Sequence, residues 1–279
     1  MSDCTFYLGT HEPSWLRRSP VALFVSRRRL ARLKLLPRAR CAWALDSGGF
    51  TELQMHGAWS LSPADYAASV RRYIAEIGGM AWAAPQDWMC EPVVIAGGRV
   101  GPVRFAGTGL SVEEHQRRTV ANLLELRELA PEVPWIPVLQ GWERADYLRC
   151  WERYERAGVP LEREPIVGVG SVCRRQHTAQ ALAIFEALQP LRLHGFGLKL
   201  QGLAQAGHLL SSADSMAWSY GASKRGWLCG RPHARGGKSC ANCYTYAHQW
   251  REQAQAVVRG PRQQGLFGGL GRADKWVAP

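Results

Sequence analysis

The chain has 279 residues, 46% hydrophobic and 21% charged, which is long enough for one large domain and unlike the composition of a disordered chain. The 35 lysines and arginines outnumber the 23 aspartates and glutamates, so the net charge of +12 predicts a surface that attracts polyanions, nucleic acid above all. No stretch reaches the roughly 20 apolar residues of a membrane span. Because residues 1–4 do not begin a signal peptide and the eight cysteines are mostly scattered, we expect no membrane partner and a reducing, cytoplasmic location.

Short apolar runs alternate with helical patterns along the whole chain, as in repeated βα units. The predicted strands cover residues 6–9, 21–25, 43–45, 80–87, 135–141, 166–171, 193–199 and 209–215. The predicted helices are a basic amphipathic helix over 26–36, a helix from the cap Ser62 to residue 78, a helix from the capping-box residue Ser111 to residue 129, and two more near 147–154 and 178–188, with an irregular insert over 97–109. The fold class is therefore predicted as α/β, a (β/α)8 TIM-like barrel over residues 1–222. A doubly wound open sheet is the alternative that the periodicity leaves open.

Polar side chains and glycines stand where the predicted strands end. In a barrel these ends meet at one mouth, so we expect the following residues to converge although they are far apart in sequence: Asp46, Asp87, Gln140, Gly141, Gly168, Gly170, Lys199 and Asp214. Asp46 is followed by Ser47, Gly48, Gly49 and Phe50. Glycines there let the backbone turn sharply and let a flat ligand lie against main-chain amides. The alternative is an ordinary Ser-Gly-Gly turn.

A cysteine cluster follows the predicted barrel, in residues 223–258. Cys229, Cys240, Cys243 and His248 offer three thiols and one imidazole, which suits a closed, structural zinc site. His233 is a competing ligand, and free thiols or a redox Cys-x-x-Cys pair are the alternative to zinc. Residues 259–279 are predicted to form a carboxyl-terminal tail of unassigned role.

These motifs, taken in order, resemble those of a known enzyme family. The resemblance rests on Asp46-Ser-Gly-Gly-Phe50, Asp87, Gln140-Gly141, Val167-Gly-Val-Gly170, Asp214 and the Cys/Cys/Cys/His cluster, which are similar to motifs of the tRNA-guanine transglycosylases. Those enzymes are zinc-containing (β/α)8 barrels that exchange a guanine for a 7-deazaguanine. The segment Gly9-Thr-His11-Glu-Pro13-Ser-Trp15-Leu16 and the short chain are more similar to the DNA-acting, DpdA-type transglycosylases of phage and bacterial DNA-modification systems.

The resemblance implies a role for each matching residue. Asp214 would be the nucleophile that attacks C1′ of a deoxyguanosine, as the nucleophile of a retaining glycosidase does, and Asp46 the second catalytic carboxylate, active in proton transfer. Asp87 would accept hydrogen bonds from the N1–H and amine of guanine. Gln140 and the amides around Gly141 and Gly170 would hold its O6 and N7 edge.

The implied partners are DNA, with the target base flipped out or single-stranded, and a free 7-deazaguanine base, in the cytoplasm of a bacterial host. Arg27 to Arg40 would grip the phosphates, and Trp15, Trp43 and Trp142 are stacking candidates, although tryptophans are more often core. A homodimer is left open. The same chemistry on tRNA is one alternative function, and a non-catalytic, zinc-containing nucleic-acid-binding protein is another. No nucleotide-binding motif implies ATP or a nicotinamide.

Overall fold

The computed structural model describes residues 4–172, 179–230 and 239–259. Its main feature is a sheet of eight strands that are hydrogen-bonded in the order β4-β3-β2-β1-β10-β9-β8-β7. All neighbouring pairs are parallel. The strands are β1 (Thr5–Thr10), β2 (Leu23–Ser26), β3 (Trp43–Asp46), β4 (Met80–Ala83), β7 (Val138–Leu139), β8 (Val167–Val169), β9 (Leu193–Gly195) and β10 (Leu210–Ser215). Each overlaps one of the eight predicted apolar runs, so the predicted α/β class with a parallel eight-stranded sheet is confirmed.

Helices occupy most of the connections between the strands. In α3 (Pro63–Ile77) the Ser62 hydroxyl accepts a hydrogen bond from the Asp65 amide at 3.1 Å. In α5 (Val112–Leu129) the Ser111 hydroxyl accepts a hydrogen bond from the Glu114 amide at 3.2 Å. Both predicted helix caps are therefore confirmed. The remaining helices are α1 (Arg27–Leu30), α2 (Gly49–His56), α4 (Pro92–Ala96), α6 (Arg144–Arg156), α7 (Ala179–Ala187), α8 (Leu200–Ala206), α9 (Ala217–Arg225) and α10 (Tyr244–Arg259), with short 3-10 turns at Pro13–Arg17, Leu161–Arg163 and Gly207–Leu209.

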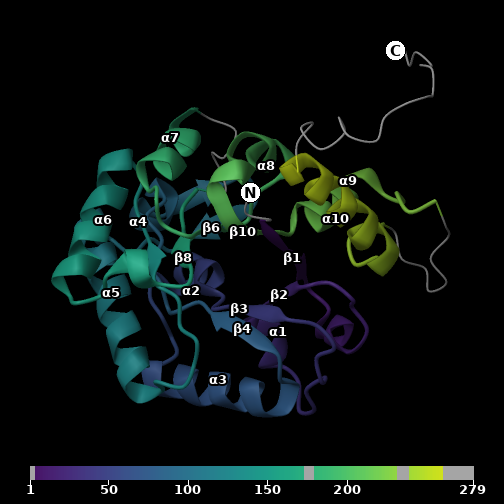
Figure 1. Cartoon of the computed structure of the whole chain (residues 1–279), viewed down its shortest axis with the longest axis horizontal. Coiled ribbons are helices and arrows are strands. Elements are labelled where there is room, and N and C mark those ends of the chain that lie inside the picture. The colour runs from purple at the N-terminus through teal and green to yellow at the C-terminus, as the bar shows by residue number, and fades with distance from the viewer. Residues whose placement is uncertain (1–3, 173–178, 231–238, 260–279) are drawn as a thin grey trace.

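The sheet curls until its two outer strands approach each other. Ala83, the last residue of β4, forms a parallel bridge with Trp135, which precedes β7. The Ala83 amide donates to the Pro134 carbonyl at 3.0 Å, and the Ile136 amide donates to the Ala83 carbonyl at 3.2 Å. Figure 1 shows the strands in the middle of the view and α3, α5, α6, α7 and α10 around the outside. Because all strands are parallel, their carboxyl ends face the same end of the sheet.

The predicted basic helix over residues 26–36 is wrong beyond its first turn, because α1 ends at Leu30. The carbonyls of Leu33 and Lys34 instead accept hydrogen bonds from Arg72 on α3, at 3.4 and 2.9 Å. Leu35 is 84% exposed, so the leucine spacing in this segment does not form the buried stripe of an amphipathic helix.

Two regular elements replace predicted turns and loops. The insert over residues 97–109 contains an antiparallel hairpin formed by β5 (Gly98–Val100) and β6 (Val103–Phe105). The Ser-Gly-Gly turn after Asp46 leads directly into α2, because Gly48 adopts a left-handed φ of 82° at the cap of that helix. A Cβ at Gly48 would also lie 2.8 Å from the Arg28 side chain, so a glycine is required there for two reasons.

The core contains two of the three tryptophans that were candidates for stacking on bases. Trp15 and Trp43 are 2% and 0% exposed. Trp15 stacks on Trp218 with ring centroids 5.7 Å apart, and the Trp43 indole donates to the Gly78 carbonyl at 2.8 Å. Both are therefore core residues and cannot stack on nucleic acid. Within the described residues, no helix combines the length and the apolar character that crossing a membrane requires.

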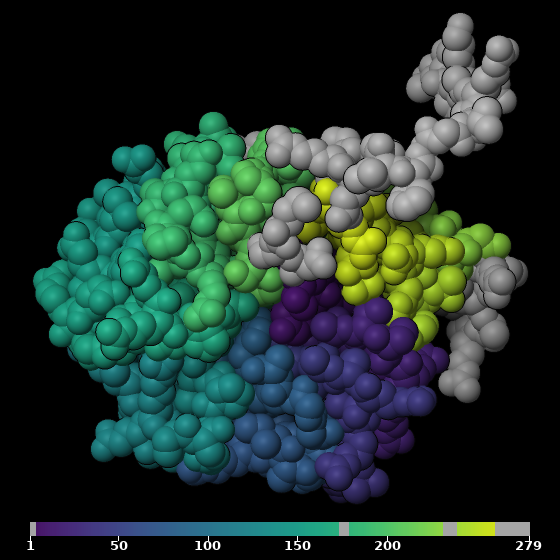
Figure 2. All heavy atoms as spheres, viewed as in Figure 1, coloured from purple at the N-terminus to yellow at the C-terminus, as the bar shows by residue number. Residues whose placement is uncertain are grey.

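The last described helix, α10, packs against the beginning of the chain, where yellow meets purple in Figure 2. The rings of Phe6 on β1 and Trp250 on α10 have centroids 6.0 Å apart. The Arg18 guanidinium lies 4.2 Å from the centre of the Tyr244 ring. Aromatic contacts through α10 therefore join the described part of residues 223–258 to the main body.

Candidate active site

A cavity of about 630 Å³ opens at the carboxyl ends of the strands. Three carboxylates that are far apart in sequence line it: Asp46 at the end of β3, Asp87 after β4, and Asp214 on β10. Asp87 and Asp214 are only 7% and 4% exposed. The volume falls in the range of small-molecule sites, about 300 to 1,000 Å³. The parallel sheet thus brings the three predicted acids to one hollow large enough for a purine.

Asp46 is held by the turn that follows it. Its Oδ1 accepts a hydrogen bond from the Gly48 amide at 3.0 Å, which the left-handed conformation of Gly48 makes possible. Burial raises the pKa of Asp46, although the hydrogen bonds from Gly48 and Ser26 act in the opposite direction. The negative charge of Asp214, which lines the same cavity, also raises the pKa of Asp46.

Asp87 is oriented by side chains from two other strand ends. The Gln140 amide nitrogen donates to Oδ2 at 2.5 Å, and the Ser47 hydroxyl donates to Oδ1 at 3.4 Å. Burial raises the pKa of Asp87 to about 7; the Gln140 hydrogen bond lowers it and the charge of Asp46 raises it further. Asp87 therefore changes its charge near neutral pH.

Asp214 has a partner that the sequence did not single out. His194, on the neighbouring strand β9, is fully buried, and its Nε2 lies 3.3 Å from Asp214 Oδ1. The same oxygen accepts a hydrogen bond from the Gly197 amide at 3.0 Å. His194 is also enclosed by aromatic rings, with Phe196 and Trp82 at centroid distances of 4.6 and 4.7 Å. Within a buried strand a single histidine is more often core, so no sequence signal distinguished it.

The predicted glycines have packing roles that their positions in sequence do not reveal. Gly170 lines the cavity, but its amide donates to the Leu139 carbonyl at 3.0 Å within the sheet rather than to a ligand. A Cβ at Gly170 would clash with the Gln140 amide, so its missing side chain is what lets Gln140 reach Asp87. Gly141 and Gly168 are not among the lining residues; a Cβ would lie 2.7 Å from Asp146 at the first and would meet Phe196 at the second.

The remaining predicted residues differ in whether they line the cavity. Ser47 and Phe50 line the cavity. Gly49 begins α2, and a Cβ there would lie 2.8 Å from the Trp59 ring. Lys199 does not line the cavity, because β9 ends at Gly195 and the chain then carries Lys199 to an exposed position at the cap of α8.

Ser171 links the loops on one side of the cavity, and sequence reasoning missed its role. It adopts a φ of 57°, unusual for a residue with a side chain. Its hydroxyl accepts a hydrogen bond from the Cys90 amide at 2.8 Å and lies 2.8 Å from both Gln140 Oε1 and Glu91 Oε2. Glu91 is a further buried carboxylate of the lining, after β4. The local strain at Ser171 therefore serves to hold Gln140 and Glu91 together.

The arginine-rich segment divides into internal and cavity-facing members. Arg27 and Arg28 both pair with the buried Glu52 of α2, at 3.0 and 2.9 Å. Arg29 lies 3.2 Å from His11 Nδ1, and Arg28, Arg29 and Arg32 line the mouth of the cavity. Arg27 therefore stabilises the fold, whereas Arg29 and Arg32 present positive charge where a phosphate would approach.

Comparison with protein families adds to this geometry. A family model described as DpdA, DeoxyPurine in DNA protein A, matches residues 2–273. The chain belongs to the DpdA family. The predicted family is thus confirmed, and with it membership of a family of DNA-modifying, transglycosylase-type enzymes. A comparison with curated proteins found no match.

This DpdA family member also contains a group of residues that could hold a metal ion. The sulfur atoms of Cys229, Cys240 and Cys243 all lie within 4.8 Å of one another. Tetrahedral zinc with Zn–S bonds of about 2.3 Å places its sulfurs roughly 3.8 Å apart, so small side-chain movements complete the fit. The amides of Leu228 and Tyr246 donate to the sulfurs of Cys240 and Cys243 at 3.2 and 3.4 Å, which orients these two sulfurs. Three of the four ligands of a tetrahedral zinc site are therefore grouped here.

His248, the predicted fourth ligand, is not part of this group. Cys243 lies immediately before α10, whereas His248 lies on the second turn of that helix. Its ring packs against Tyr244 with centroids 4.2 Å apart, and its buried Nε2 has no hydrogen-bond partner in the described part of the chain. The competing ligand His233 lies outside the described residues.

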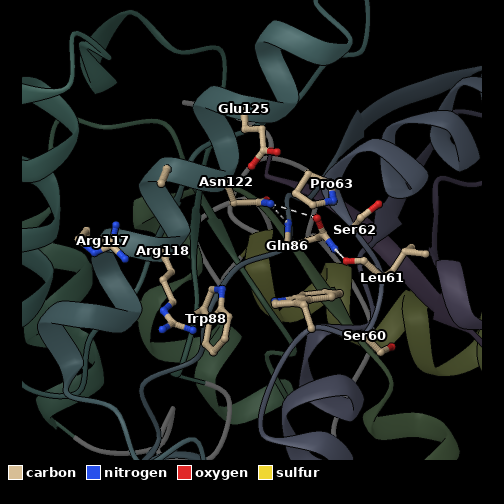
Figure 3. A pocket seen from close by; sticks show the side chains of 12 residues that line it. Ser60, Leu61, Ser62, Pro63, Gln86, Trp88, Arg117, Arg118, Asn122 and Glu125 are labelled. Carbon is tan, nitrogen blue, oxygen red and sulfur yellow. Dashed lines mark hydrogen bonds between the residues drawn. The ribbon is translucent and has the colours of Figure 1, made fainter.

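A second hollow, of about 490 Å³, lies beside the segment that carries Asp87 (Figure 3). Asn122 on α5 accepts a hydrogen bond from the Gln86 amide at 2.8 Å and donates to the Gln86 side chain at 3.0 Å. Glu125 is the single carboxylate among its lining residues, so this hollow lacks the acid cluster of the cavity. The hydrogen bonds between Gln86 and Asn122 hold the segment that carries Asp87 against α5.

Proposed function

We propose that this DpdA family member exchanges guanine in DNA for a free 7-deazaguanine base through a covalent bond to Asp214. The observation that carries the proposal is the meeting of Asp46 with the buried Asp87 and Asp214 in one cavity of purine size. Grouping three acids around one cavity, two of them buried, is unfavourable, so a chemical role is the physical reason to retain them. The family description, which names deoxypurines in DNA, favours DNA over tRNA as the substrate.

In the first step Asp214 attacks C1′ of the target nucleotide. Both hydrogen bonds from His194 and Gly197 reach Oδ1, so we assign the attack to Oδ2. The C1′–Oδ2 bond forms as the C1′–N9 bond breaks, and the electron pair of the broken bond leaves with guanine. Asp46, whose pKa burial raises, holds a proton and gives it to the departing base.

In the second step the incoming base takes the place of guanine. Asp46 accepts the proton from N9 of the free 7-deazaguanine, N9 attacks C1′, and the C1′–Oδ2 bond breaks to release Asp214. Retention of configuration follows from two displacements, as in retaining glycosidases. No other reactant is needed, because each base carries one proton in or out.

Asp87 is the proposed recognition group for both bases. Its ionised carboxylate accepts hydrogen bonds from the N1–H and the exocyclic amine, a pair of donors shared by guanine and 7-deazaguanines. Gln140 and Ser47 hold that carboxylate in position. The cavity-facing Arg29 and Arg32 would bind the flanking phosphates.

Two structural expectations belong to the same proposal. We propose that the curled sheet works as a (β/α)8 barrel, supported by the bridge between Ala83 and Trp135. We also propose that Cys229, Cys240 and Cys243 hold a structural zinc ion, which would tie the chain ahead of α10 to the start of that helix.

The test is incorporation of a labelled 7-deazaguanine base into DNA, single-stranded DNA and tRNA, followed by nucleoside mass spectrometry. Asp214→Asn should abolish incorporation and the covalent protein–DNA adduct while DNA binding persists. Glu128→Gln, an exposed acid on α5, is the matched control and should behave as the unaltered protein. Undiminished exchange by Asp214→Asn would contradict the nucleophile assignment, and DNA binding without any exchange would favour a non-catalytic protein.

A further inference from the structure

The β5–β6 hairpin projects from the body with an apolar tip between two arginines. Residues 98–104 are all exposed, including Val100 at 46% and Val103 at 40%. The tip is Gly101-Pro102, and the two charged residues of the hairpin are Arg99 and Arg104. No acid occurs between Glu91 and Glu113 in the sequence. The two exposed valines flank the tip together, and this segment carries only positive charge.

The pairing register separates the hairpin into two faces. Gly98 pairs with Phe105, Arg99 with Arg104, and Val100 with Val103. Since side chains alternate between the faces of a strand and paired residues share a face, the valines lie on the face of Phe105 and the arginines on the other. The hairpin is therefore a short ribbon with one apolar and one cationic face.

The base of the hairpin is fixed to the wall of the cavity. Phe105 is 2% exposed, packs in a cluster with Leu53 and Trp88, and meets the Phe50 ring edge-on at 5.8 Å. Phe50 itself lines the cavity. The Ala106 amide donates to the Gln54 carbonyl of α2 at 2.9 Å. The hairpin thus rises from the same aromatic cluster that forms one side of the proposed base pocket.

The neck of the hairpin is closely packed. Gly97 and Gly107 lie in contact, because a Cβ at Gly107 would be 2.9 Å from the Gly97 Cα atom. Both adopt positive φ values, 76° and 80°. From Phe105 to the tip the strand extends roughly 10 Å, at about 3.4 Å per residue, or about three base-pair steps. A fixed neck and a reach of this length suit a rigid projection beside the cavity.

We infer that this hairpin is a wedge that enters a DNA duplex beside the target guanine. The inference rests on the proposed function, because a stacked base can reach the buried acids only after it leaves the helix. The valines and Pro102 would fill the space between base pairs, as apolar wedges do in bent DNA, while Arg99 and Arg104 on the opposite face neutralise nearby phosphates. The wedge stabilises the open duplex while the guanine occupies the cavity.

The experiment compares exchange in a fully paired duplex with exchange in the same duplex whose target guanine lies in an unpaired bubble. In Val100→Ser/Val103→Ser the ratio of duplex to bubble exchange should fall at least about tenfold, since only the paired guanine needs to be extruded. Leu35→Ser removes a more exposed apolar side chain elsewhere and should keep the ratio. An unchanged ratio in the valine variant would overturn the inference.

A fluorescence measurement tests the wedge without relying on exchange. A 2-aminopurine placed next to the guanine should brighten when the unaltered protein binds the duplex, and the valine variant should lose this signal. Absence of brightening with the unaltered protein would overturn the wedge. In Arg99→Gln/Arg104→Gln the slope of log Kd for duplex binding against log salt concentration should become smaller by about 2.

The same samples distinguish this inference from its alternatives. Failure of exchange on both substrates, with intact brightening, contradicts the proposed function and leaves the wedge standing. Brightening that persists in the valine variant contradicts the wedge alone. If the valine variant instead changes the sedimentation coefficient in the absence of DNA, the hairpin is a contact between copies of this chain, and the wedge is overturned.

Discussion

His194 lies between Asp214 Oδ1, at 3.3 Å, and the Ser212 hydroxyl, at 2.7 Å. When Ser212 donates to Nδ1, the imidazole donates from Nε2 to the carboxylate. The histidine thereby fixes the rotation of Asp214, and Ser212 fixes the tautomer of the histidine. A buried relay of this kind orients Asp214, the proposed nucleophile, without touching a substrate.

His194→Phe should lower the rate at which the covalent DNA adduct forms. The phenyl ring keeps the packing between Trp82 and Phe196 but removes the hydrogen bond to Asp214, and misplacing a reacting group costs about 100-fold in rate. Ser212→Ala should give a smaller decrease. Single-turnover trapping of the adduct measures both, and an unchanged rate in His194→Phe would show that the imidazole does not orient Asp214.

Base exchange should increase with pH through about 7. The pKa of Asp87 is raised to about 7 by its burial, and only the ionised carboxylate can accept hydrogen bonds from both donors of the base. The measurement is kcat/KM for the incoming base between pH 5.5 and 8.5, about 1.5 units on either side of the midpoint, because this ratio reports ionisations of the free enzyme. Activity independent of pH across this range would contradict the recognition role.

Asp87→Asn should become more stable than the unaltered protein as the pH rises from 4 to 8. The pKa of Asp87 is about 7 when folded against an ordinary value of 3.8, so between these values the folded state binds more protons than the unfolded state. Its ionisation therefore lowers the free energy of unfolding as the pH rises, by at most about 4 kcal/mol. Thermal melts at both ends of the range measure the difference, and a Tm difference that does not change with pH would refute it.

Gly170→Ala should lose both stability and exchange activity. The added methyl group meets the Gln140 amide, which must move away from Asp87. Overpacking of this kind costs about 1 to 3 kcal/mol. Gly207→Ala is the matched control, because its Cβ would lie at an ordinary 3.4 Å from Val258. Equal melting temperatures for the two variants would show that Gln140 moves aside for the added methyl group without loss of stability.

Cys240→Ser should release bound zinc and lower the melting temperature. Cys240 is the most buried of the three clustered cysteines, and its sulfur accepts the Leu228 amide. Metal analysis of the purified protein is the direct readout, with Cys41→Ser, outside the cluster, as the control. Stoichiometric zinc in Cys240→Ser would exclude the cysteine group as the metal site.

The three acids could be found from sequence because each follows an apolar run, and the end of a buried parallel strand is where polarity changes. Gly48 and Gly170 were recognisable for the same reason. Gly170 makes room for Gln140, but this role depends on a neighbour from another strand and could not be predicted. Lys199 was named as the first charge after its run. Strand β9, however, ends at Gly195, and the turn that follows carries Lys199 away from the cavity.

His194 and His248 show what the sequence does not contain. A histidine inside an apolar strand is indistinguishable from a core residue until the opposite strand supplies Asp214 and Ser212. The order Cys-x-x-Cys-x4-His resembles a ligand set, yet the direction of His248 depends on the phase of α10, which begins within that spacing. The hairpin was missed because glycines interrupt its alternating pattern on both sides.

The pairing of β1 with β10 joins one of the first strands of the chain to the last strand of the sheet. Tyr7 of β1 pairs with Asp214 of β10, so β1 completes its pairing only after β10 has been synthesised. Contacts between such distant segments form late in folding. A chain that ends before β10 lacks Asp214, the proposed nucleophile, and we expect such a chain to form no covalent bond to DNA.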